Sequence, residues 1–84
     1  MNHSIQSDER TERLLASASL YAEDASVDID MMAGRLTELA EGDETALGRA
    51  HRRAVLRAGE HSADAVTRRT LEITRRALER TGSC

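Results

Sequence analysis

Apolar residues recur at spacings of three and four over residues 14–39, and this run limits the possible folds more than any other feature of the chain. Such spacing lines the side chains along one face of a helix. The members of the run are Leu14, Ala18, Tyr21, Ala25, Ile29, Met32, Leu36 and Leu39. The pattern therefore predicts one long amphipathic helix from about residue 8 to residue 41.

The ends of this helix are indicated by residue types that start and stop helices. Ser7 or Asp8 is expected as the N-cap, and Gly42 is expected to end the helix because glycine tolerates a positive φ. The weakest point is Ser26-Val27-Asp28, where two poor helix formers flank a β-branched residue. A break near Ser26 to Asp28 would give the alternative architecture, a monomeric four-helix bundle.

Two shorter helices are predicted in the second half of the chain. Asp43 can cap a helix over about 44–58, and Ser62 can cap another over about 62–80. The chain has no Pro, and the alternation typical of a strand is confined to a short stretch at 27–31. The expected fold is an all-α protomer of three helices.

The whole chain, 1–84, is expected to form a single domain with disordered ends at 1–6 and 81–84. A chain of 84 residues buries only about 60–65% of the surface that it exposes when unfolded. Phe and Trp are absent and Tyr21 is the single aromatic residue, so the core must consist of aliphatic side chains and many alanines. The stability of such a domain is expected to be small.

Small domains usually compensate for a small core with disulfides, a metal or self-association, and the lone Cys84 cannot close an intramolecular disulfide. A helix over 8–41 would also be about 50 Å long, more than a monomer of this size can cover. We therefore expect a homodimer with this helix at its seam. The residues predicted for the assembly surface are Tyr21, Ile29, Met32 and Leu36.

Charge is divided unevenly along the chain. Residues 1–42 hold three Arg and nine acids, a net charge of −6, whereas residues 43–84 hold nine Arg and six acids, a net charge of +3. The halves could pair with each other, or the basic half could bind an anionic partner such as nucleic acid. The residues predicted for an anionic-partner surface are Arg52, Arg53, Arg68 and Arg69. All twelve basic residues are Arg, which together with the abundant Ala suggests a GC-rich bacterial genome.

Residues that could carry chemistry do not form a recognisable catalytic or metal-binding pattern. Asp24 and Asp28, four apart on the predicted helix, could share a divalent cation, but such pairs are common on solvated helix faces. The cluster at 60–64 resembles the polar start of a helix, and His51 is expected to pack beside the apolar face. No nucleophile motif, phosphate-binding loop or zinc spacing is present. We therefore predict no enzyme activity, no cofactor, and no metal or catalytic residues.

The predicted function is that of a non-catalytic interaction or regulatory module that associates with itself and with a protein partner. One alternative is a DNA-binding transcriptional regulator that uses the Arg-rich second and third helices. Another is an accessory subunit or a small metal-dependent nucleotide hydrolase. No apolar run approaches the roughly 20 residues that cross a bilayer, and no signal peptide is evident, so a cytoplasmic location without membrane contact is expected.

Overall fold

Four α-helices and no strand make up the part of the chain that the structure, a computed structural model, describes: residues 2–60 and 64–82, with side chains over 9–59 and 64–81. The helices are α1 at Asn2–Ala22, α2 at Ile29–Leu39, α3 at Glu44–Glu60 and α4 at Ala65–Gly82. The predicted all-α class is confirmed, but the predicted number of three helices is wrong.

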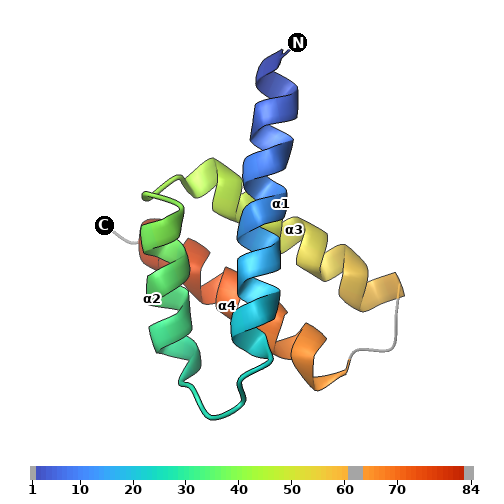
Figure 1. The fold of residues 1–84 in the computed structure, drawn as a ribbon, viewed down its shortest axis with the longest axis vertical. Helices are drawn as coiled ribbons and strands as arrows, with labels where there is room; N and C mark the ends of the chain where they lie inside the picture. Colours follow the sequence, from blue (N-terminus) through green and yellow to red (C-terminus); the bar gives the residue numbers. More distant parts are fainter. Residues whose placement is uncertain (1, 61–63, 83–84) are drawn as a thin grey trace.

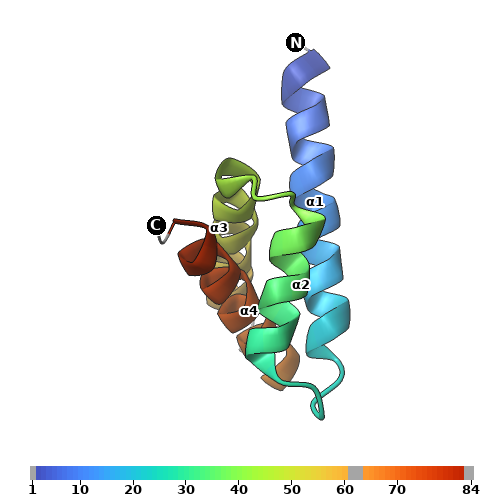
Figure 2. The ribbon, with the colours of Figure 1, turned by 90° about the vertical axis from the view of Figure 1, so that its left-hand side faces the viewer.

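The four helices pack in two layers. Helices α1 and α2 lie antiparallel in one layer, and α3 and α4 form the other (Figures 1 and 2). Helix α4 packs against each of the other three helices. The first turns of α1 extend beyond the rest of the bundle in both views. Layers of paired helices therefore bury their apolar faces within one chain, as the four-helix alternative predicted.

The core between the layers consists mainly of small side chains. Eight of the fourteen buried apolar residues found among the described side chains are alanines. The larger members are Leu14, Leu15, Met32, Leu36, Leu47 and Ile73. Because alanine adds little bulk, helix backbones can approach closely along these seams. The shallow, alanine-rich core expected from the composition is confirmed.

The predicted helix over 8–41 is interrupted at residues 23–28. The Asp24 carboxylate accepts hydrogen bonds from the Ser26 N–H, at 3.1 Å, and from the Ser26 hydroxyl, at 2.6 Å. The Val27 N–H donates to the Asp24 carbonyl oxygen at 3.3 Å. These local bonds compete with helical ones at residues of low helix propensity, so the chain turns back here. As a result α1 and α2 both pack against α4.

Some predicted helix ends are confirmed and others are corrected. The Ala46 N–H donates to Asp43 Oδ1 at 3.1 Å, so Asp43 caps α3 as expected. Helix α1 begins at Asn2, so Ser7 and Asp8 lie within it and neither is its N-cap. Helix α3 continues to Glu60, past its expected end at residue 58.

The start of α4 is set by a residue that the sequence pattern did not single out as a cap. The Thr67 N–H donates to Asp64 Oδ1 at 2.8 Å, which makes Asp64 the cap. The predicted cap, Ser62, lies outside the described residues. At the predicted disordered ends, residues 2–6 and 81–82 are helical, and residues 1, 83 and 84 lie outside the described part.

Helix α2 ends in a Schellman motif, one residue earlier than predicted. Glu41, at φ 55°, and Gly42, at φ 72°, both have left-handed backbones. The Gly42 N–H donates to the Thr37 carbonyl and the Glu41 N–H to the Glu38 carbonyl, at 3.2 and 3.0 Å. Gly42 was predicted to be the first left-handed residue, whereas Glu41 takes that position. Because α2 ends here, Asp43 can cap the start of α3.

Candidate functional site

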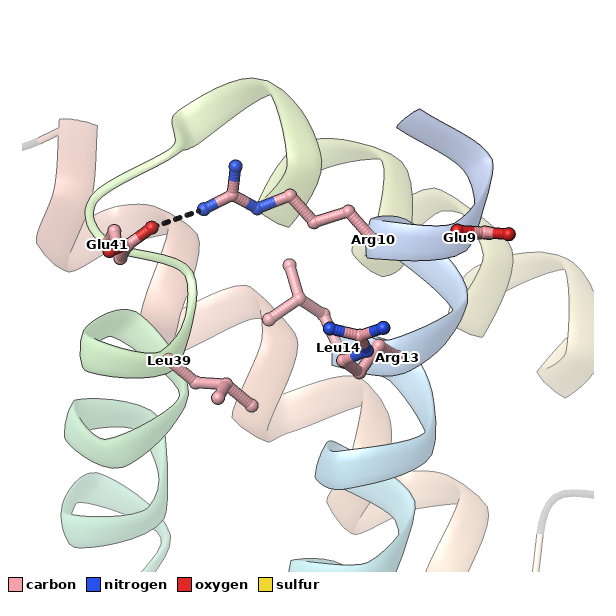
Figure 3. A pocket seen from close by; sticks show the side chains of 6 residues that line it. All are labelled: Glu9, Arg10, Arg13, Leu14, Leu39 and Glu41. Carbon is pink, nitrogen blue, oxygen red and sulfur yellow. Dashed lines mark hydrogen bonds and ion pairs between the residues drawn. The ribbon is translucent and has the colours of Figure 1, made fainter. Parts of the chain in front are cut away.

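A shallow pocket of about 320 Å³ lies between α1 and the end of α2 (Figure 3). Arg10 reaches across it and donates to Glu41 Oε1 at 3.0 Å and to the Ala40 carbonyl oxygen at 3.1 Å. Leu39 extends from α2 toward α1. The residues that line the pocket are Glu9, Arg10, Arg13, Leu14, Leu39 and Glu41. The pocket contains two arginines. Arg10 is bound to the end of α2, whereas Arg13 has no ion pair among the described residues.

An arginine also binds the C-terminus of α1, where the two layers meet. Arg69 Nε, on α4, donates to the carbonyl oxygen of Ala22, the last residue of α1, at 2.7 Å. Carbonyls at a helix C-terminus have no partner within the helix and carry a partial negative charge. Arg69 therefore stabilises the end of α1.

The predicted anionic-partner surface is divided by the fold. Arg53 forms an ion pair with Glu12 of α1, and Arg69 is bound to the end of α1. Arg52 and Arg68 are exposed, and neither has an ion pair within the described part of the chain. Two members of the predicted set thus contact α1 within the bundle, and the other two are exposed. Sequence spacing alone could not separate these two roles, because the partners come from distant parts of the chain.

The predicted assembly residues lie inside the bundle or at its margin. Met32 and Leu36 belong to the core, with 2% and 0% of their surfaces exposed, so the fold leaves them no contact with a second copy. Tyr21 and Ile29 are partly buried against the same core. The prediction treated one helical stripe as an outer seam, whereas folding back at 23–28 turned it inward.

Large apolar side chains that do face solvent lie close in sequence to the predicted ones. Leu20 on α1 is 65% exposed, and Met31 and Leu39 on α2 are 55% and 44% exposed. On a helix, Leu20 shares the outward side of α1 with Arg13 and Ala16, and Met31 shares that of α2 with Arg35. We call Leu20, Met31 and Leu39 the α1–α2 outer face. Leu20 and Met31 lie off the predicted apolar stripe, which was the sequence signal for their exposure, whereas Leu39 belongs to that stripe and its exposure was not predicted.

The candidate metal ligands are separated or engaged elsewhere. Asp24 lies in the turn and Asp28 is the N-cap residue of α2, so the two carboxylates do not share a helix face. The hydrogen bond from the Ser26 hydroxyl, followed by that from its N–H, lowers the pKa of Asp24. Among residues 9–59 and 64–81, whose side chains are described, no three His, Cys, Asp or Glu side chains are grouped as a metal site requires.

The cluster at 60–64 is described only at its ends. The Thr67 N–H is the main cause of a lowered pKa at Asp64, as is usual for a capping carboxylate. His61, Ser62 and Ala63 lie outside the described residues. Glu60 is the last residue of α3, and Asp64 caps the start of α4.

His51 is packed as the sequence suggested. Its Nδ1 atom lies 3.2 Å from the Thr74 hydroxyl, which also bonds the Thr70 and Leu71 carbonyls of α4. Among the described residues, every buried side-chain nitrogen or oxygen has a hydrogen-bond partner. His51 thus joins α3 to α4.

An ion-pair network runs along α4 and reaches α2. Glu72 pairs with Arg75 at 2.8 Å and with Arg76 at 3.3 Å, and Arg76 also pairs with Asp30 of α2. The hydrogen bond from Arg75 is the largest influence on Glu72 and lowers its pKa. Arg75 and Arg76 are both engaged in these ion pairs, so they are not free to bind an anionic ligand.

The described helices differ in length and polarity, and among them none has the length and apolar character needed to span a membrane. Comparison of the chain with protein-family models, with curated proteins and with solved structures found no match of any of the three kinds.

Proposed function

We propose that this protein is a non-catalytic helical interaction module that associates with a second copy through the α1–α2 outer face. The observation that carries the proposal is the exposure of Leu20, Met31 and Leu39, at 65%, 55% and 44%, on two adjacent helices. Apolar side chains left in water favour burial against another surface. Methionine adapts its shape to a partner, which suits Met31 to such a surface.

The size of the domain favours the same proposal. A domain this small has little core to stabilise it, and burial of further apolar surface between two copies would add to that stability. Arg13 and Arg35 on the same layer have no ion pair among the described residues. They could therefore pair with acids across a symmetric interface.

Sedimentation velocity over a wide range of protein concentration tests the proposal. The wild-type protein should shift from monomer to dimer as its concentration rises, and Leu20→Ser/Met31→Ser should remain monomeric. Leu56→Ser, which removes an equally exposed leucine from α3, is the matched control and should dimerise like the wild type. A wild-type protein that stays monomeric, or a double variant that still dimerises, would contradict the proposal.

A further inference from the structure

A groove of about 540 Å³ lies between α3 and α4, in the layer opposite to the pocket between α1 and α2. Its lining includes Gly48, Arg49, His51, Arg52 and Val55 of α3 and Leu78 of α4. A Cβ atom added at Gly48 would meet only Leu78 Cδ1, at 3.9 Å. Gly48 therefore keeps the floor of the groove open where any other residue would place a side chain.

The groove joins apolar surface to unpaired positive charge. Val55 in the lining is 46% exposed, and Leu56, its neighbour in sequence but not part of the lining, is 58% exposed. Arg49 and Arg52 have no ion pair within the described residues, whereas Arg53 beside them is paired with Glu12. Glu44 is the one acid in the lining and lies at the start of α3. The groove thus combines two aliphatic side chains, Val55 and Leu78, with two arginines that have no ion pair among the described residues.

We propose that this groove docks an acidic amphipathic helix of a partner protein. Aliphatic side chains of that helix would cover Val55 and Leu78, and its carboxylates would pair with Arg49 and Arg52. A trench between two helices fits a third helix, because its apolar residues repeat with the same period. Arginine binds carboxylates through two parallel hydrogen bonds, which gives such contacts direction as well as charge.

The exposed aliphatic side chains favour a protein partner over nucleic acid. A phosphate backbone would pair with Arg49 and Arg52 but would leave Val55 and Leu56 against a charged, hydrated surface. A partner helix with carboxylates beside leucines matches both kinds of side chain at once. The groove lies on the α3–α4 layer, so this proposal does not depend on association through the α1–α2 outer face.

A displayed library of helical peptides with randomised surface positions tests the proposal with the intact protein as bait. Selected peptides should be enriched in Asp or Glu beside Leu, Ile or Met at helical spacing. Titrated into isotope-labelled protein, a selected peptide should shift the NMR signals of residues 48–56 and of Leu78. Replacing its acids with the corresponding amides should weaken binding by about tenfold or more.

Three variants separate the contributions of charge and shape. Arg49→Gln/Arg52→Gln should weaken peptide binding by about tenfold or more, and Gly48→Leu should block binding by filling the floor while leaving both arginines in place. Arg57→Gln/Arg68→Gln removes two other exposed arginines that have no ion pair among the described residues, and it should leave binding unchanged. Circular dichroism of each variant confirms that the helices are retained.

Several results would overturn the proposal. Selected peptides could lack the acidic and aliphatic pattern, or their signals could map away from the groove. Binding could survive both Gly48→Leu and Arg49→Gln/Arg52→Gln. Duplex DNA could bind with a steep salt dependence that Arg49→Gln/Arg52→Gln abolishes, which would assign these arginines to phosphate recognition.

Discussion

Arg10 and Arg69 each close the C-terminal end of a helix that belongs to another part of the chain. Arg10 donates to the Ala40 carbonyl at the end of α2, 30 residues away, and Arg69 donates to the Ala22 carbonyl at the end of α1, 47 residues away. A guanidinium combines several donors with a permanent charge, so it satisfies a free carbonyl and the helix dipole together. These bonds hold separate helices in a fixed relation.

Replacing Arg69 with methionine should destabilise the fold, because the apolar part of the side chain is kept while its donors and charge are removed. We expect Arg69→Met to lower the free energy of unfolding by about 1.5–3 kcal/mol, the range for a hydrogen bond that involves a charged group. Urea denaturation followed by circular dichroism measures the loss. Arg68→Met, one residue earlier and without an ion pair among the described residues, is the control. Equal losses in the two variants would contradict the assigned role.

Glu72 should make the stability depend on pH on the acid side. Arg75, then Arg76, hold its pKa below the ordinary value of 4.5 in the folded protein. The contribution of Glu72 is therefore complete above about pH 4.5 and is lost as the pH falls through the lowered pKa. The melting temperature of Glu72→Gln should fall less steeply than that of the wild type below this pH. Parallel curves for the two proteins would show that the ion pairs add nothing to stability.

At the scale of elements, the sequence predicted which faces are buried better than it predicted where helices end. Leu14, Ala18, Met32 and Leu36 are buried as one stripe would place them, yet Ala25 is exposed because it falls in the turn. The helical period indicates which face of each segment is buried, but it does not indicate a change of direction between two segments. The signals for that change were Asp24 and Ser26, whose side chains bond locally.

The candidate surfaces were harder to predict than the faces. Whether an arginine is free depends on acids and carbonyls that only the fold brings near it, as the different environments of Arg52 and Arg53 show. The same holds for the groove above Gly48, because Leu78 reaches it from another helix. Composition correctly predicted a small, alanine-rich core, since that property does not depend on the path of the chain.

Two helix starts in the structure offer a direct comparison of capping. Asp43 accepts a hydrogen bond from the Ala46 N–H at the start of α3, whereas Asp28 at the start of α2 makes no side-chain cap bond. Asp43→Ala should lower the free energy of unfolding by about 1 kcal/mol, and Asp28→Ala by only a few tenths. Thermal unfolding measures both losses. Asp43→Asn, which keeps an acceptor oxygen, should restore most of the stability, and an equal loss in the two alanine variants would contradict the comparison.

At the scale of the whole molecule, α4 lies at the centre of the packing. It contacts each of the other helices, and its buried side presents Thr70, Ile73, Thr74 and Ala77 to them. The threonine hydroxyls bond carbonyls of α4 itself, so their burial leaves no polar group without a partner. Close packing of this kind tolerates little added volume.

Enlarging a buried alanine of α4 should therefore be costly. Ala77 is fully buried, and Ala77→Leu should lower the free energy of unfolding by about 1–3 kcal/mol, or more if the helices must separate. Ala65→Leu makes the same substitution at an exposed position of α4 and should change stability by less than about 0.5 kcal/mol. Calorimetry of the two variants checks the difference. If Ala77→Leu were as stable as Ala65→Leu, the core would be looser than described.

Because α4 contacts each of the other three helices and follows all of them along the chain, its position governs the order in which the bundle can form. While residues 2–60 emerge from a ribosome, α1 can pack against α2 and α3, but the parts of these three helices that face α4 stay uncovered, and the Ala22 carbonyl lacks the Arg69 guanidinium. The bundle can close only after synthesis has passed Ala77. Until then the nascent chain exposes the faces that α4 will cover to proteases and chaperones.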